Sequence, residues 1–292
     1  MYNIQKIRDM IELSNIHFGY SKKRPLFQDL NMTMQSGHIY GLLGKNGAGK
    51  TTLLKIMTGL CFPQQGTPLI FGKRAEQRHS EVLSNIYFLP EELYTPHLKM
   101  SDYVCNYARF YPNFNHEQLA QYLADFELTG YDGFMDKLSH GQKKKIHIAF
   151  ALAANTQILI MDEPTNGLDI PSKSIFRKVM ASAVNENQMV VISTHQVRDL
   201  HSLIDSIIIL DNGSVIINEE NDRITEKLLF QVEAHGTENT QSEILYSEDT
   251  LQGIYTVKEN TQQIENKLDI ELFFNAVMCN KNQIQNIFNS KS

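Results

Sequence analysis

The glycine-rich segment at residues 44–52 carries the residue types best suited to chemistry. In order, these residues are Gly44, Lys45, Asn46, Gly47, Ala48, Gly49, Lys50, Thr51 and Thr52. The spacing matches the G-x-x-x-x-G-K-[ST] string of a phosphate-binding loop, in which glycines let backbone N–H groups wrap around anionic oxygens. In that pattern Lys50 reaches the β and γ phosphates, the Thr51 hydroxyl binds Mg²⁺ and Thr52 holds the α phosphate. The segment predicts a site for a nucleoside triphosphate.

Two adjacent carboxylates follow a short apolar segment further along the chain. Residues 158–161 are all apolar, and Asp162 and Glu163 come next. Because ligands bind beyond the carboxyl ends of strands in open α/β sheets, this pair is expected beside the glycine-rich loop. Asp162 is placed to hold the Mg²⁺ shell, and Glu163 to polarise an attacking water as general base. A strand end capped by acids is common, but loop and pair together indicate a nucleoside triphosphatase.

The elements that must position these groups alternate between strand and helix. Apolar, β-branched segments predict strands at residues 11–18, 39–43, 86–89, 158–161, 189–192 and 207–210, the last turning at 211–213 into 215–217. Helical spacing predicts helices at residues 53–57, 142–154, 172–184 and 197–204. This alternation is typical of an α/β fold with a parallel sheet covered on both faces.

Two stretches depart from this alternation. Residues 95–137 read as amphipathic helices broken at Pro112 and Gly130, which indicates an inserted helical subdomain. Most of its aromatic side chains are expected to form the subdomain's own core; they are Tyr94, Tyr103, Tyr107, Phe110, Tyr111 and Phe114. After about Arg223 the pattern weakens, with β-like pieces at 228–232 and 254–257 and a helix near 272–277.

Further motifs make the chain resemble the ATP-binding subunits of ABC transporters. The segment 138–142, Leu-Ser-His-Gly-Gln, is similar to the family signature LSGGQ, and 164–169 is similar to the family's D-loop. His195 stands where the family's switch histidine follows a strand, and Tyr20 matches the aromatic residue that stacks on adenine. The resemblance covers roughly residues 11 to 217, and the motifs occur in the family's order.

The resemblance implies the fold and its division. It predicts an α/β P-loop cassette over residues 11–222, with a RecA-like core, an antiparallel β subdomain and a helical subdomain at about 95–140. Residues 223–292 remain as a C-terminal extension of unknown role. A brace packed on the cassette is favoured slightly over a regulatory or dimer-contacting lobe, because no ligand motif occurs there.

The resemblance also implies ATP and Mg²⁺ as ligands. Catalytic roles are expected for Lys50, Glu163 and His195, the last of which contacts the γ-phosphate. Contacts to Mg²⁺ are expected from Thr51, Asp162 and Glu91. The base is expected to stack on Tyr20, and the loop residues 44–52 to hold the phosphates.

A second set of residues is expected to serve a neighbouring subunit. In the family, the signature binds the γ-phosphate of the opposite cassette, so ATP joins two cassettes head to tail. Nucleotide-binding roles are therefore expected for Ser139, Gly141, Gln142 and Asp169. The partner is either a second copy of the chain or a paralogous ATPase subunit, and two identical chains would have equivalent sites.

Two residues depart from the family pattern. His140 replaces a signature glycine, so that a side chain must fit at the nucleotide interface. Glu91 stands where the family commonly has the glutamine of the Q-loop. It can still ligand Mg²⁺ or its water, but it adds a third carboxylate near Asp162 and Glu163.

The predicted function is that of an ATP-hydrolysing subunit that powers movement of a substrate, with export favoured, through a separate membrane permease. Similarity to type-2 exporters rests on the single cassette, the signature variant and the C-terminal extension. The alternative is a soluble ABC ATPase acting in translation or chromosome maintenance. Against it, only one phosphate-binding loop occurs, and Lys50 and Ser139 leave no room between them for a long coiled coil.

Composition bounds the partners and the location. The chain has 292 residues, and its 27 Lys and Arg against 33 Asp and Glu give a net charge of −6, which disfavours a nucleic-acid partner. The longest apolar run, Ile148–Ala154, is far shorter than the roughly 20 residues that cross a bilayer. The 3 cysteines occur in no C-x-x-C pair, so neither a disulfide framework nor a zinc site is indicated. We expect a cytoplasmic chain held at the inner face of the membrane by its permease.

Overall fold

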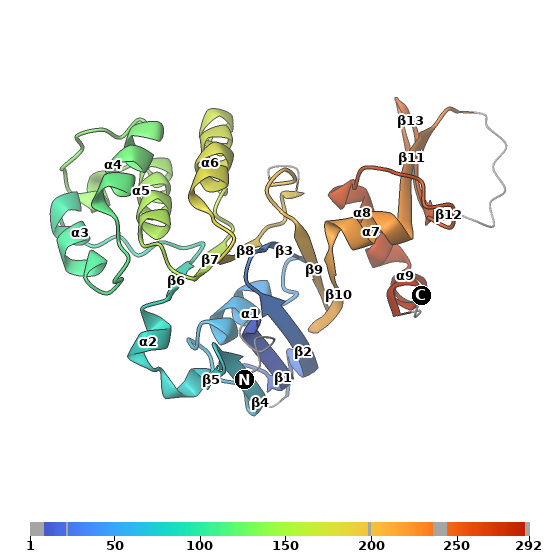
Figure 1. Cartoon of the computed structure of the whole chain (residues 1–292), viewed down its shortest axis with the longest axis horizontal. Coiled ribbons are helices and arrows are strands. Elements are labelled where there is room, and N and C mark those ends of the chain that lie inside the picture. Colours follow the sequence, from blue (N-terminus) through green and yellow to red (C-terminus); the bar gives the residue numbers. More distant parts are fainter. Residues whose placement is uncertain (1–8, 22, 198–199, 236–243, 290–292) are drawn as a thin grey trace, which may run out of the picture.

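The computed structural model describes residues 9–21, 23–197, 200–235 and 244–289 (Figure 1). A six-stranded sheet lies at the centre, in the order β10-β9-β3-β8-β7-β6. Five strands run parallel, namely β3 (Ile39–Leu43), β6 (Ile86–Leu89), β7 (Ile158–Asp162), β8 (Met189–Ser193) and β9 (Ser206–Asp211). The edge strand β10 (Ser214–Glu220) returns antiparallel to β9. The predicted parallel sheet and the turn into its last strand are thus confirmed.

Each face of this sheet packs on its own apolar core, because successive side chains of a strand point to opposite faces. Leu159, Met161 and Ile192 pack with residues of α5 (His140–Ala153) and α6 (Ile170–Ala183). Ile160 and Val191 pack on the other side with α1 (Lys50–Met57). Cover on both faces explains why these strands are apolar along their whole length.

A smaller antiparallel sheet, β2-β1-β4-β5, packs against α1 in the second core. Its strands are β1 (Asp9–Phe18), β2 (Phe27–Gln35), β4 (Gln65–Ile70) and β5 (Lys73–Arg74), followed by η2 (Ala75–Gln77) and α2 (Ser80–Leu83). The sequence analysis predicted only β1. A signal for β2 was present, since Leu30, Met32 and Met34 alternate with exposed polar residues and are all buried.

The helical subdomain contains α3 (Met100–Ala108), α4 (His116–Asp125) and η3 (Met135–Lys137). The predicted breaks are confirmed, because Pro112 lies between the two α-helices and Gly130 lies beyond the second. The expectation for the aromatic side chains holds for only half of them. Tyr103, Tyr111 and Phe114 pack into the core, whereas the exposed ones are Tyr94, Tyr107 and Phe110.

The C-terminal part forms a sheet of its own beyond α7 (Asn221–Lys227). The antiparallel order is β11-β13-β12, with β11 (Leu228–Glu233), β12 (Ile244–Thr250) and β13 (Gly253–Glu259). The helix α8 (Ile270–Cys279) packs on this sheet, and α9 (Lys281–Asn289) packs on α8 and on β10 of the central sheet. The predicted strand pieces lie in β11 and β13 and the predicted helix in α8. Figure 1 places this part at the opposite end of the molecule from the helical subdomain.

The predicted helix over 197–204 is wrong for residues 200–204. Val197 is in a 3-10 conformation, and residues 198–199 lie outside the described residues. Residues 200–203 form hydrogen-bonded turns. Leu200 and Ile204 are both buried, so their spacing of four imitates a helical face. Isolated helices this short are only marginally stable in water, so the spacing alone is a weak signal. Within the described part of the chain, no helix is both long enough and apolar enough to span a bilayer.

Candidate functional site

The glycine-rich loop connects β3 to α1 directly. Gly47 and Gly49 have φ values of 80° and 105°, in the left-handed region that favours glycine. A Cβ on Gly49 would lie 2.9 Å from the ring of Phe27, so a side chain there would also clash. Among the described residues, no side chain caps the N-terminus of α1, so the first N–H groups of this helix are available to a ligand at the loop. Loop and helix end together form a binding place for phosphate oxygens.

Lys50 lies across this loop. Its side chain is buried, and its ammonium donates to the carbonyl oxygen of Gly44 at 2.8 Å. A buried ammonium needs negative partners. Phosphate oxygens held by the loop would supply them.

Asp162 is fixed by hydroxyl groups at the end of β7. Thr51 Oγ1 donates to Asp162 Oδ2 at 2.6 Å, and the hydroxyl of Ser193 donates to Asp162 Oδ1. Asp162 and Ser193 are directly paired across β7 and β8, which explains this contact. A hydroxyl and a carboxylate beside a phosphate-binding loop are the oxygen ligands with which proteins hold Mg²⁺ on a nucleotide. The residues present therefore fit the ion.

The side chain of Glu163, unlike that of Asp162, bonds to His195. Glu163 has a φ of 46°, an unusual backbone conformation for a residue with a side chain. Its side chain is buried, and His195 Nδ1 donates to its Oε1 at 2.8 Å. Its Oε2 is buried and has no hydrogen-bond partner among the described residues. A buried, unsatisfied carboxylate oxygen is suited to accept a proton from a bound water.

A chain of side-chain hydrogen bonds leads from this centre to Glu91. Gln196 lies beside His195 and donates to Asn166 Oδ1 at 3.4 Å. Asn166 Nδ2 in turn donates to Glu91 Oε1 at 2.9 Å. The sequence analysis gave no role to Gln196, Asn166 or Ser193. Only the position of Asn166 inside the D-loop-like segment could have suggested it.

A cavity of about 600 Å³ brings most of the predicted nucleotide residues together. Its lining includes Tyr20, Asn46, Gly47, Gly49, Lys50, Thr51, Thr52, Glu91, Asp162 and Glu163. Tyr20 is 71% exposed, which excludes a role as a core aromatic, and its hydroxyl bonds Thr52 Oγ1 at 3.0 Å. The volume lies in the range of small-molecule sites.

Three predicted site residues border a neighbouring cavity instead. Gly44, Lys45 and His195 line a space of about 630 Å³ that also contacts α8 through Phe274 and Asn275. His195 is nevertheless tied to the first cavity through Glu163. Ala48 is buried in the core beneath the loop.

The signature-like residues do not line the cavity of their own chain. Ser139 caps α5 in a reciprocal pair, in which Ser139 Oγ accepts from the Gln142 N–H at 3.2 Å and Gln142 Oε1 accepts from the Ser139 N–H at 3.0 Å. His140 lies against the loop between β7 and α6, where a Cβ on Gly167 would come 2.6 Å from the His140 ring. Gly141 also faces this loop.

Asp169 is likewise away from the cavity. It caps α6 by accepting from the Ser172 N–H at 2.8 Å. Hydrogen bonds from the side chain and backbone of Ser172 lower the pKa of Asp169. The structure thus gives Asp169 a local role in starting a helix, and it does not bring this residue to the nucleotide cavity of the same chain.

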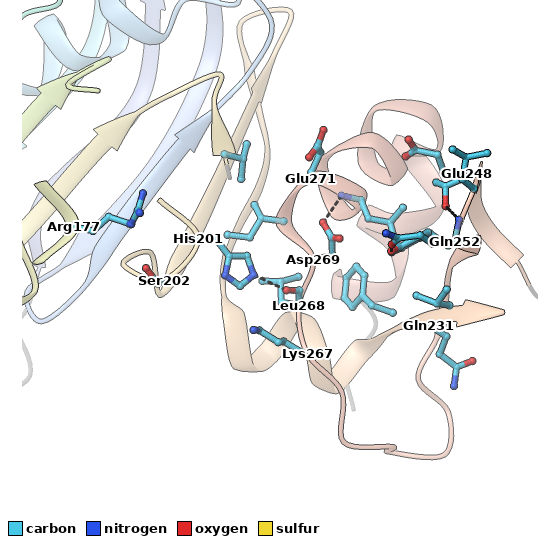
Figure 2. Close-up of a pocket in the computed structure, with 18 residues that line it drawn as sticks. Arg177, His201, Ser202, Gln231, Glu248, Gln252, Lys267, Leu268, Asp269 and Glu271 are labelled. Carbon is cyan, nitrogen blue, oxygen red and sulfur yellow. Dashed lines mark hydrogen bonds between the residues drawn. The ribbon is translucent and has the colours of Figure 1, made fainter. Parts of the chain in front are cut away.

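A larger cavity, of about 1120 Å³, lies between the cassette and the C-terminal part (Figure 2). Arg177, His201 and Ser202 face it from one side, and residues of β11–β13 and α8 from the other. His201 Nε2 donates to the carbonyl oxygen of Leu268 at 2.9 Å and so joins the two sides. The described residues contain no group of three or more His, Cys, Asp or Glu side chains arranged to hold a metal ion.

Comparison with known proteins decides the family. The ABC transporter family matches residues 27–166. The ABC transporter ATP-binding protein NatA of Bacillus subtilis (strain 168) is 30% identical over 216 residues, which cover 71% of this chain and 88% of that protein. The chain belongs to the ABC transporter ATP-binding proteins.

Other relatives of this ABC protein agree. The nickel import system ATP-binding protein NikE of Staphylococcus aureus (strain MRSA252) is 32% identical over 231 residues, covering 77% of this chain and 95% of that protein. A solved structure of an ATP binding subunit of an ABC transporter superposes with a TM-score of 0.66 at 26% identity, covering 74% of this chain and 91% of that one. A bacterial Atm1-family ABC exporter with ATP bound, at 22% identity and TM-score 0.65, covers 74% of this chain and 40% of that one and shows the same fold.

Family membership confirms the main predictions. The chain has the P-loop ABC cassette fold, binds ATP, and is an ATPase whose hydrolysis powers transport. ABC ATP-binding subunits dimerise and work with membrane permeases.

Proposed function

We propose that the cavity beside the phosphate-binding loop holds ATP with Mg²⁺ and that Glu163 is the general base of hydrolysis. The observation that carries this proposal is the contrast between two adjacent carboxylates. Asp162 has both oxygens bonded, to Thr51 and Ser193, whereas Glu163 has one buried oxygen with no hydrogen-bond partner among the described residues. The first is therefore suited to hold a cation shell and the second to accept a proton.

Within this proposal each group has a separate task. Lys50 and the N–H groups of the loop bind the β and γ phosphates, and Tyr20 stacks on the base. His195 donates to Glu163 and thereby orients its free oxygen toward the attacking water. Bound Mg²⁺ would neutralise charge on the phosphates, with Thr51 and Asp162 as its protein contacts and Glu91 near its water.

We also propose that the signature residues complete the site of a partner cassette. Ser139 is exposed and absent from the cavity lining of its own chain. Its oxygen accepts from the Gln142 N–H, and a hydroxyl that accepts one hydrogen bond can still donate its hydrogen to a phosphate. Gly141 leaves space at the same helix end. The partner is a second copy or a paralogous subunit, and the two chains enclose two ATP molecules between them.

The membrane partner is proposed to bind the helical subdomain and to hold the chain at the cytoplasmic face of the membrane. Tyr94 and Phe110 are 80% and 58% exposed, and such apolar surface is suited to a protein contact. We retain export as the proposed direction. It is supported by the signature variant and the C-terminal extension, although one relative, NikE, is named for nickel import.

We further propose that residues 223–292 brace the cassette. Their helices share an apolar core with the central sheet, and Gln285 donates to the carbonyl oxygen of Ile216 in β10 at 3.1 Å. The bond between His201 and Leu268 joins the extension to the turns at residues 200–203. The extension therefore supports one side of the catalytic centre.

The proposed base is tested by Glu163→Gln, which keeps the shape and removes the proton acceptor. The variant is expected to bind ATP with unchanged affinity in an equilibrium titration and to lose turnover in a phosphate-release assay. Turnover equal to that of the parent would remove Glu163 from the mechanism. Loss of ATP binding would show that Glu163 acts in binding instead.

A further inference from the structure

A buried lysine lies on the helix that the signature-like segment begins. Lys144 is on α5, about one and a half turns from its capping residue Ser139. Its side chain has 0% exposure. Its ammonium donates to the backbone carbonyl oxygen of Glu91 at 3.3 Å. Glu91 lines the nucleotide cavity, so the ammonium contacts a residue at the edge of that cavity.

Burial lowers the pKa of Lys144, and the nearby carboxylates of Glu91, Asp162 and Glu163 offset part of that effect by favouring the charged ammonium. A fully buried ammonium is costly unless opposite charges and hydrogen bonds offset its lost hydration. Glu91, Asp162 and Glu163 all line the nucleotide cavity, where their like charges repel one another. A buried cation close to them adds an attraction that offsets this repulsion. The lysine and the extra carboxylate at Glu91 therefore compensate each other.

The Glu91 segment is held from two sides. Lys144 binds its backbone carbonyl from the signature helix, and Asn166 binds its side-chain carboxylate from the loop after β7. Because Ser139 and Lys144 belong to one rigid helix, a shift of the signature end on contact with a partner also shifts the ammonium. The contact is thus placed to link the signature to the cavity.

We propose that Lys144 is a positioning residue for ATP hydrolysis, which holds the Glu91 segment at the cavity and supplies the positive charge that the third carboxylate requires. This inference rests on the proposed function of the site. It concerns a residue that does not line the nucleotide cavity and acts through Glu91.

The test is a double-mutant cycle on the full chain. Lys144→Met removes charge and donor, Lys144→Gln keeps a donor without the charge, and Glu91→Gln removes the charge that needs compensation. The matched control is Lys143→Met, one residue earlier on α5 and only half-buried. Each variant is measured for kcat, for KM of ATP, and for its thermal unfolding midpoint by circular dichroism.

We expect Lys144→Met to lower kcat at least about tenfold with KM changed less than about threefold, because a misplaced group costs turnover rather than ground-state binding. In the Glu91→Gln background the same substitution should cost at least about threefold less than in the parent, because the charge no longer needs compensation, whereas loss of the bond to the backbone carbonyl oxygen of residue 91 costs the same in both backgrounds. Lys144→Gln should lower kcat less than Lys144→Met does, because it removes the charge and keeps a hydrogen-bond donor. This loss of kcat should also be smaller in the Glu91→Gln background. Lys143→Met should stay within about twofold of the parent.

Two results would overturn the inference. One is a kcat for Lys144→Met within about twofold of the parent, and the other is an equal fold loss in both backgrounds, which marks a purely structural residue. If Lys144→Met does not fold at the assay temperature, the same criteria are applied to Lys144→Gln. Failure of the proposed function is recognised separately, because it appears as unchanged turnover in Glu163→Gln whatever the lysine variants do.

Discussion

Replacement of His195 by alanine tests the geometry around the proposed base. His195 Nδ1 donates to Glu163 Oε1 at 2.8 Å, and Glu163 Oε2 has no partner among the described residues. Without the imidazole, a buried carboxylate would therefore lose its charge-assisted donor and its fixed orientation. Hydrogen bonds to charged groups are worth about 1.5–3 kcal/mol.

If this loss is expressed in the transition state, His195→Ala lowers kcat by about 10- to 150-fold, since each 1.36 kcal/mol is tenfold. KM for ATP should change less than about threefold, because His195 lies outside the lining of the nucleotide cavity. The measurement is steady-state release of phosphate at saturating Mg·ATP. The control is His17→Ala, a histidine on β1 that pairs with Asp29 instead. Unchanged kcat, or a loss confined to KM, would refute the orienting role.

Three further outcomes are expected. Glu91→Gln should leave ATPase activity within about an order of magnitude, because a carboxamide still reaches water and Asn166; near-complete loss in the steady-state assay would give Glu91 an essential role. Tyr20→Ala should raise KM for ATP by about 5- to 150-fold, as loss of 1–3 kcal/mol of base stacking predicts, and an unchanged KM would contradict stacking. Burial, assisted by the charge of Lys144, lowers the pKa of His147 from 6.5 to about 4. Between these two pH values the unfolded chain binds a proton at His147 and the folded chain does not. Stability should therefore fall between pH 6.5 and 4 in urea titrations, and His147→Leu should show a shallower fall; equal slopes would contradict this.

Residues that act within one contiguous motif could be predicted from the sequence. Contacts that depend on which strands pair and how helices pack could not. The loop between β3 and α1 was predictable because its glycines, Lys50 and Thr51 act within one contiguous turn. Ser193 was not, because its contact with Asp162 depends on the pairing of β7 with β8. Lys144 is one of three consecutive lysines, which the sequence does not distinguish, and only the packing of α5 against the Glu91 segment shows that it is buried.

The same distinction explains the errors in the fold. The predicted helix over 197–204 came from the spacing of Leu200 and Ile204, which burial in a turn produces equally well. β4 was missed because its sequence contains Gly66 and Pro68, which are rare inside strands. Sheet pairing with β1 imposes its conformation from outside the segment.

The central claim is that Glu163 completes hydrolysis in a site shared by two chains. It is tested most directly by sedimentation of the Glu163→Gln variant with Mg·ATP. We predict a stable dimer that retains two ATP molecules, and a monomer when Ser139 is also replaced by arginine, because the larger side chain blocks the partner's phosphate. A monomer at saturating ATP for Glu163→Gln alone would contradict the account.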